Sequence, residues 1–126
     1  MFAVGRILVG IAGALIALGG CYDLFTSKLP PNFVAKCADR QQAARLTREL
    51  LRALGGALVA IGTAIVFVTL HAHGRFSRFE LVLLLLLAVP SEGINAFAMR
   101  RVGSPWPFPI AFLAILLVGS MLCILP

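Results

Sequence analysis

Four long apolar segments alternate with shorter polar stretches along the chain. Each has roughly the 20 apolar residues that a helix needs to cross a bilayer core of about 30 Å. None of them alternates polar and apolar positions as a transmembrane barrel strand does. The pattern predicts an all-α, integral membrane four-transmembrane-helix bundle, antiparallel and up-and-down, that forms a single domain over residues 1–126. The predicted spans cover about residues 2–20, 51–70, 79–99 and 108–125.

The first segment also has features of a secretory signal. Arg6 precedes most of its apolar stretch, and the run "LGGC" that ends at Cys21 resembles a lipoprotein cleavage site. Three further spans follow, however, so the chain does not need a cleavable signal to reach a membrane. We therefore expect the first segment to remain uncleaved, as a transmembrane helix.

The longest connection between spans covers about residues 21–50. Its "KLPPN" stretch ends any preceding helix, because paired prolines cannot continue one. The following "NFVAKCADRQQAARLTRELLRAL" has helix-forming residues throughout, and Asp39 and Gln42 have the spacing of a capping pair at a new helix start. We expect the second span to have an amphipathic cytoplasmic extension, which lies on the membrane surface before the span enters the bilayer.

The composition supports lipid as the surrounding solvent. The chain is 60% hydrophobic and 13% charged, with a mean hydropathy of +1.00. A soluble domain averages roughly 45–50% apolar and about 25% charged residues. The sequence contains no recognisable nucleic-acid-binding module. The pI near 10.3 is therefore explained by a basic rim against anionic membrane lipids, and no nucleic acid partner is expected.

Lysine and arginine are distributed unevenly between the two sides of the predicted bundle. The side that holds both termini carries three of them, Arg6, Arg75 and Arg78. The opposite side carries eight: Lys28, Lys36, Arg40, Arg45, Arg48, Arg52, Arg100 and Arg101. Because cytoplasmic loops are enriched in Lys and Arg, the distribution predicts a multi-pass protein whose termini face the periplasm.

Small residues form a stripe along the first span. Arg6, Gly10, Gly13, Ala17 and Gly20 recur at alternating steps of four and three, and the second span has a similar glycine-rich region at residues 55–63. Small residues at this spacing let two membrane helices approach closely. The stripe therefore predicts a close-packing surface. Alternatives are a slot for a ligand, or the contact through which a larger membrane complex or a second copy binds at Gly10, Gly13 and Ala17.

Glu92 and Asn95 lie within one helical turn of each other in the otherwise apolar third span. At 1.5 Å per residue, Glu92 is about 12 Å below the basic side of the membrane. An ionisable group at that depth normally faces the bundle interior or a wet cavity. Pro90 is expected to kink the helix beside it. Polar residues from three spans gather in this half of the bundle, and the candidate binding residues are Asp23, Arg48, Glu49, Arg52, Glu92 and Asn95.

This cluster has two compatible interpretations. In the first, Glu92 pairs with Arg48 or Arg52 and joins the second and third spans. In the second, the cluster lines a cytoplasm-facing pocket for a lipophilic ligand with a polar head. No metal site is predicted, because His71 and His73 are two positions apart and do not share a helix face.

Three stretches give the chain a family resemblance. "GRILVGIAGALIALGGCYDLF", "RELLRALGGALVAIG" and "GINAFAMRRVGSP" resemble the small uncharacterised branch of the DoxX-like four-helix membrane proteins. "SEGINAF" departs from that pattern, because it places a glutamate and an asparagine where less polar residues are expected. The resemblance implies a four-helix bundle in a bacterial inner membrane. It also implies an association with quinone-linked oxidoreductase complexes or the chaperoning of membrane proteins.

Two functions follow as hypotheses. The first is a protein that binds a lipophilic ligand, a quinone or a lipid, or that acts as an accessory subunit or chaperone of a larger membrane complex. The second is a membrane enzyme in which Glu92 and Glu49 perform acid–base chemistry on a lipophilic substrate. The sequence identifies no further cofactor and specifies no reaction.

Overall fold

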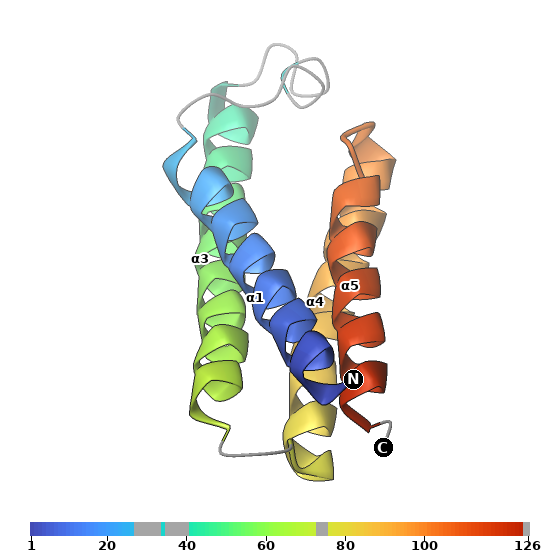
Figure 1. The fold of residues 1–126 in the computed structure, drawn as a ribbon. Coiled ribbons are helices and arrows are strands. Elements are labelled where there is room, and N and C mark those ends of the chain that lie inside the picture. Colours follow the sequence, from blue (N-terminus) through green and yellow to red (C-terminus); the bar gives the residue numbers. More distant parts are fainter. Residues whose placement is uncertain (27–33, 35–40, 73–75, 125–126) are drawn as a thin grey trace.

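The structure is a computed structural model, and it describes residues 1–26, 34, 41–72 and 76–124. In this part of the chain every regular element is a helix, which confirms the predicted all-α four-helix fold. The two termini lie at the same end of the bundle, and the helices run up and down between the two ends (Figure 1). The helices are α1 (Phe2–Phe25), α3 (Gln41–His71), α4 (Arg78–Val102) and α5 (Pro107–Ile124).

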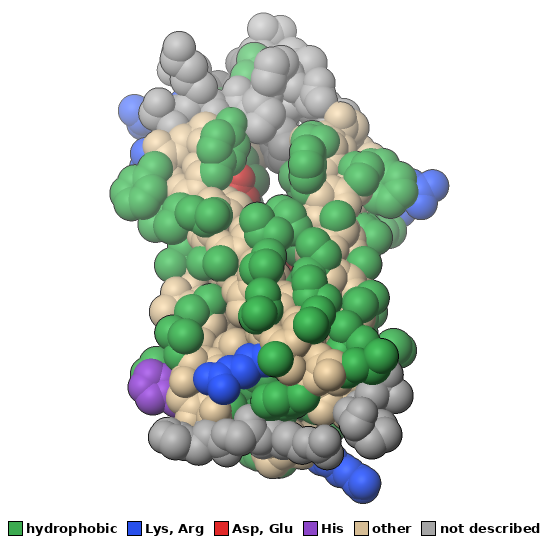
Figure 2. Space-filling model, viewed as in Figure 1, with side chains coloured by type: hydrophobic (Ala, Val, Ile, Leu, Met, Phe, Trp, Pro, Cys, Tyr) green, Lys and Arg blue, Asp and Glu red, His purple; other side chains and the backbone are tan. Residues whose placement is uncertain are grey.

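All four helices are long and apolar enough to cross a membrane. Their most apolar stretches have mean hydropathies between 1.9 and 2.3, and most of each stretch is not covered by the rest of the protein. Exposed Leu, Ile, Val and Phe side chains cover the outside of the bundle, as expected when the surroundings are lipid (Figure 2). The chain is therefore a multi-pass membrane protein.

Two helix boundaries differ from the predicted ones. The first helix continues through "CYDLF" to Phe25 and ends at Thr26, whose hydroxyl donates to the Tyr22 carbonyl at 2.5 Å. Helix α3 begins at Gln41, ten residues before the predicted span, because "QQAARLTREL" consists largely of good helix formers. These residues are the predicted extension of the second span, and they continue α3 in a single helix without turning onto the membrane surface. The capping pair predicted at Asp39 and Gln42 falls outside the described residues.

Helix α4 is capped at both ends. At its start, the Ser77 hydroxyl accepts from the Glu80 N–H at 3.1 Å, and Glu80 Oε2 accepts from the Ser77 N–H at 2.6 Å. This reciprocal pair is a capping box. At its end, Gly103 adopts a left-handed φ of 73°, and the Ser104 N–H donates to the Met99 carbonyl at 2.9 Å. These caps set α4 antiparallel to both of its chain neighbours.

Helix α1 occupies the centre of the bundle. It crosses in front of the others in Figure 1 and packs most extensively on α3 and then on α5. Helix α4 packs mainly on α5 and meets α3 at few positions. The buried apolar core follows these contacts, and its most enclosed members are Val9, Ala12, Ile16, Ile65, Leu84, Ala88 and Leu116.

Glycines bring the backbones of α1 and α3 into contact. A Cβ added at Gly20 would lie 2.6 Å from the Gly55 carbonyl oxygen, and one added at Gly13 would lie 2.7 Å from the Ile65 side chain. A Cβ at Gly62 would overlap the backbone nitrogen of Ala17. Both helices space their contact glycines seven residues apart, so the same antiparallel register repeats along the interface.

This interface confirms the predicted close-packing surface. The stripe on α1 faces α3 of the same chain, so a second protein would have to displace α3 to reach Gly13. The opposite face of α1 packs closely on α5 in the same way, through glycines. A Cβ at Gly5 would lie 2.7 Å from the Gly119 carbonyl oxygen of α5.

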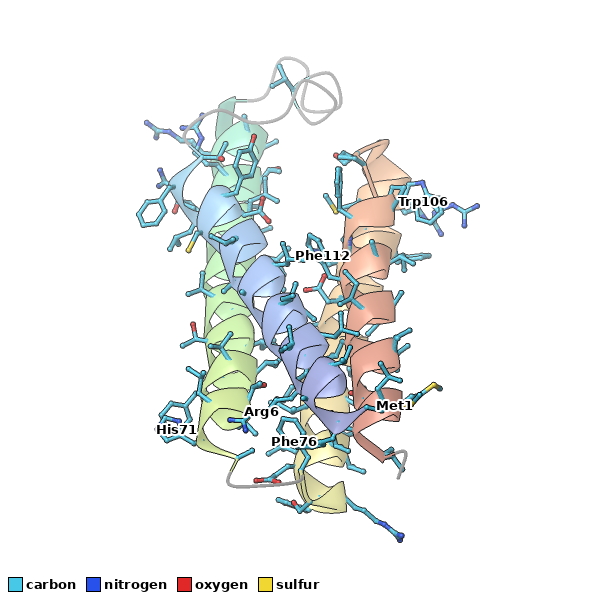
Figure 3. All side chains as sticks on the ribbon, in the orientation of Figure 1. Met1, Arg6, His71, Phe76, Trp106 and Phe112 are labelled. Atoms are coloured by element: carbon cyan, nitrogen blue, oxygen red, sulfur yellow. The ribbon has the colours of Figure 1, made fainter. Side chains whose placement is uncertain are left out.

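Arg6 joins the stripe to the end of α3. Its Nε donates to the Thr69 carbonyl at 2.9 Å, and its Nη2 donates to the Leu70 carbonyl at 3.1 Å. The last carbonyls of a helix have no partners within the helix and form the negative end of its dipole. The guanidinium therefore caps α3 and supplies the charge that this end prefers. Figure 3 shows Arg6 beside the last turn of α3.

Gly62→Ala should destabilise the protein, because the new methyl group meets the backbone of α1, which cannot move aside cheaply. We expect a loss of about 1–3 kcal/mol in the free energy of unfolding, as for other overpacked cores. Gly56→Ala is the matched control on the same helix, since a Cβ at Gly56 has no other atom within 4 Å. Thermal unfolding in detergent measures both. Equal melting temperatures for the two variants would contradict the assigned interface.

Arg6→Met should also lower the melting temperature, since it leaves the Thr69 and Leu70 carbonyls without their donor. We expect a cost of about 1–2 kcal/mol, the range for charged hydrogen bonds at a helix terminus. Faster amide exchange in the last turn of α3 should accompany it. Arg78→Met, an exposed position at the same end of the bundle, serves as the control. A loss of equal size there would argue against a capping role for Arg6.

Candidate functional site

Glu92 is enclosed by the bundle. Its residue is 2% exposed, and it ranks among the largest fully buried side chains of the described chain. Asn95, one turn further along α4, is 9% exposed. Both side chains therefore face inward, as the sequence predicts. Transferring a carboxyl group out of water is costly unless the group gains a hydrogen bond, a proton or a counter-charge, so the surroundings of Glu92 decide its role.

The expected ion pair between Glu92 and an arginine of α3 is absent among the described residues. Arg52 pairs instead with Glu49 on its own helix, with 3.0 Å between Nη1 and Oε1. Both side chains of that pair are well exposed, so it contributes little to stability. Arg48 is half-buried, and its Nε has no hydrogen-bond partner in the described part. The hypothesis that Glu92 joins the second and third spans through Arg48 or Arg52 was therefore wrong.

The physical reason lies in how the helices pack. Helix α4 leans on α5 and meets α3 at few positions, so the arginines of α3 do not reach it. Glu49 and Arg52 are three residues apart on one helix surface, and such neighbours can pair without any particular helix arrangement. The Glu49–Arg52 pair within α3 therefore forms, and the predicted ion pair between α3 and Glu92 of α4 does not, among the described residues.

Glu92 has no cationic partner among the described residues. Oε1 of its carboxyl has no hydrogen-bond partner there either. Asn95 lies one turn away on the same helix, and Asp23 lies near the end of α1, in the same half of the bundle. Asp23 is half-buried, and it lies where α1 contacts Gly55 of α3. The site thus contains two carboxyl groups and one amide, contributed by α1 and α4.

A hollow lies at the end of the bundle where these groups gather. The ends of α1 and α3 near Phe25 and Gln41 diverge from the ends of α4 and α5 near Val102 and Pro107 (Figure 1). The surface is notched between these two pairs of helices, and an acidic side chain is visible in the notch (Figure 2).

Phe112 is the aromatic residue that links the two sides of this region. It projects from α5 toward α1 (Figure 3), and its Cε2 would lie 3.9 Å from a Cβ at Gly19. The sequence analysis did not single out Phe112. From the sequence, Phe112 could have been recognised only as an aromatic residue that lies opposite a glycine of the first span. Recognising that pair requires knowing that α5 packs on α1.

The structure thus brings together three of the six predicted site residues, Asp23, Glu92 and Asn95. The exposed Glu49–Arg52 pair is separate from them, and Arg48 forms no ion pair with either acid. No group of three or more metal-ligating side chains occurs within the described residues. The assembled groups mainly accept hydrogen bonds, and the charge that they can carry is negative.

The chemistry of the site must be inferred from these residues themselves. Comparisons of the chain with protein-family models, with curated proteins and with solved structures find no match.

Proposed function

We propose that this small membrane protein binds a lipophilic molecule, such as a quinone or a lipid, with its polar head beside Glu92. The observation that carries the proposal is the buried Glu92 carboxyl, whose Oε1 lacks a partner among the described residues. An apolar helix has no structural need for such a group, because a hydrophobic residue of the same size avoids the desolvation cost. A ligand that pairs with the carboxyl gives the residue a role.

The surroundings of Glu92 support this proposal. The bundle is hollowed at the same end, between α1 and α3 on one side and α4 and α5 on the other (Figure 2). Apolar side chains cover most of the helices, and Phe112 offers an aromatic face beside α1. Ligand sites in membrane bundles commonly combine apolar walls with a few convergent polar groups. The bilayer itself supplies lipophilic molecules at high local concentration.

The enzyme hypothesis has less support. It requires Glu92 and Glu49 to act on one substrate, whereas Glu49 is exposed and paired with Arg52 on α3. The accessory role is compatible with ligand binding, and the resemblance to DoxX-like proteins supports it together with a bacterial inner-membrane location. Because the glycine stripe of α1 is covered by α3, we place any partner contact elsewhere on the exposed apolar surface.

We further propose that the termini face the periplasm. The end opposite the termini carries most of the lysines and arginines, as cytoplasmic ends do. Arg100 lies 5.8 Å from the Trp106 ring centroid at that end, and Arg101 lies 5.1 Å from the Phe97 ring centroid. Arginine and aromatic residues at a helix end are typical of the membrane interface.

A reporter that is active only in the cytoplasm tests the orientation. Fused after Pro126 it should be inactive, because the C-terminus is expected in the periplasm. Fused after Ser104, in the turn between α4 and α5, it should be active. The reverse pattern would overturn the assigned orientation without affecting the fold.

Substitution of Glu92 separates ligand binding from structural support. Glu92→Met removes a buried, incompletely paired carboxyl, so the ligand-free protein should become more stable by about 1–3 kcal/mol. A structural ion pair predicts the opposite, a loss of about 3–5 kcal/mol. Glu92→Gln, which keeps the shape, should retain the fold. Melting temperature in detergent and native mass spectrometry of bound lipid are the measurements.

The proposed function requires that both variants lose bound lipid relative to the unaltered protein. Glu49→Met is the control, since it removes an exposed carboxylate with little expected effect on either measurement. Retention of the same lipid by Glu92→Met and Glu92→Gln would refute the assigned ligand site.

A further inference from the structure

The charges around Glu92 indicate what kind of head group would suit the site. Helix α4 contributes the buried Glu92 and Asn95, and α1 contributes the half-buried Asp23 near its C-terminal end. Helix α5 contributes the aromatic ring of Phe112 near α1. Helix α3 contributes no ion pair to either acid, because Arg52 is engaged by Glu49. Within the described residues, neither carboxyl group forms an ion pair with a cation, and Glu92 Oε1 has no hydrogen-bond partner.

Two carboxylates in a medium of low dielectric repel each other strongly. The repulsion is relieved when one carboxyl binds a proton, or when a cation lies between the two. A cation with N–H groups does more, because it also donates to Glu92 Oε1, the buried acceptor that has no partner. An aromatic face such as that of Phe112 attracts the same kind of group.

Resting on the proposed function, we infer that the ligand is a lipophilic amine: an apolar body that carries a protonated nitrogen, held between Glu92 and Asp23. The nitrogen donates to Glu92 Oε1, and Asp23 supplies the second negative charge. The Asn95 amide orients the Glu92 carboxyl from one turn away, and the apolar body lies along the hydrophobic helices beside the hollow.

Other head groups match these residues less well. A quinone presents carbonyl oxygens, and a phosphate or a fatty acid presents anionic oxygens, so each needs donors or cations. The Asn95 amide is the neutral donor of the assembled site, and the described arginines form no ion pair with Glu92 or Asp23. An anion would add to the repulsion between the carboxylates, whereas an ammonium group relieves it.

Three probes with the same alkyl chain test the inference: dodecylamine, dodecanol and dodecanoate. They are titrated into the full chain in maltoside micelles at matched micelle-phase concentrations, and binding is followed by thermal shift and native mass spectrometry. Dodecylamine should bind at least about tenfold more tightly than dodecanol, as expected for a buried charged hydrogen bond, and dodecanoate should bind least.

Two variants test whether Glu92 and Asp23 cause the preference for the amine. Glu92→Gln and Asp23→Asn should each reduce dodecylamine binding by a larger factor than dodecanol binding, so that the preference for the amine is lost. Glu80→Gln is the matched control. It neutralises a glutamate at the opposite end of the same helix, and glutamine preserves the capping box with Ser77. Loss of the amine preference in Glu80→Gln as well would overturn the assignment to Glu92.

Nanodiscs that contain equal amounts of phosphatidylethanolamine and phosphatidylglycerol distinguish the sources of the amine. Selective, Glu92-dependent retention of phosphatidylethanolamine identifies a lipid head group, and binding of dodecylamine alone identifies a free amphiphilic amine. Both results support the inference. Equal or tighter Glu92-dependent binding of dodecanol or dodecanoate overturns the amine and leaves the proposed function standing. Absence of any Glu92-dependent binding overturns both.

Discussion

The backbone contact between α1 and α3 is the interaction on which the rest of the bundle depends. Lipid chains are as apolar as leucine, so helices in a membrane associate through close packing and hydrogen bonds, with little help from the hydrophobic effect. At Gly13, Gly20, Gly55 and Gly62 the absence of side chains lets two backbones approach closely enough for extensive van der Waals contact. Gly5 and Gly119 join α5 to the opposite face of α1 in the same way. Helix α4 is then positioned largely through α5.

This order of packing explains why an open region exists. A bundle with four equally close interfaces would have a closed centre, whereas here α3 and α4 meet at few positions. The two pairs of helices diverge toward the end that carries Phe25 and Val102 (Figure 1). Glu92 lies on α4, which meets α3 at few positions, and the described arginines of α3 form no ion pair with it. The location of the close contacts thus determines the chemistry of the site.

The sequence predicted the fold well, because the property that creates it is local. Twenty apolar residues in a row indicate a span whatever surrounds them, and the α1 stripe indicated close packing from its spacing alone. The extension of the second span over residues 41–50 had to be predicted from helix-forming residues instead, because those residues are not apolar, and α3 does begin at Gln41. Hydropathy reports where a helix enters lipid and is insensitive to where the helix begins.

The site could be predicted only in part, for a related reason. The cost of burying a carboxyl in a span predicted that Glu92 and Asn95 face inward, and the structure agrees. The partner of Glu92 depends on which helices touch, and neither composition nor spacing determines that. Charge complementarity favoured Arg48 or Arg52, yet Arg52 took the partner three residues away on its own helix. Phe112 was missed because its significance comes from packing opposite Gly19.

Arg6 has a consequence for how the protein enters the membrane. Its guanidinium finds its partners, the carbonyls of Thr69 and Leu70, only after a further sixty residues have been synthesised. Until then, the Arg6 guanidinium at the start of the first span has no hydrogen-bond acceptor from α3. Insertion of α1 and α3 together, as a helical hairpin, removes that difficulty, because the Arg6 charge and the carbonyl end of α3 are then at the same end of the hairpin from the start. The glycines that hold the finished bundle together would then also serve as the contact surface of that early hairpin.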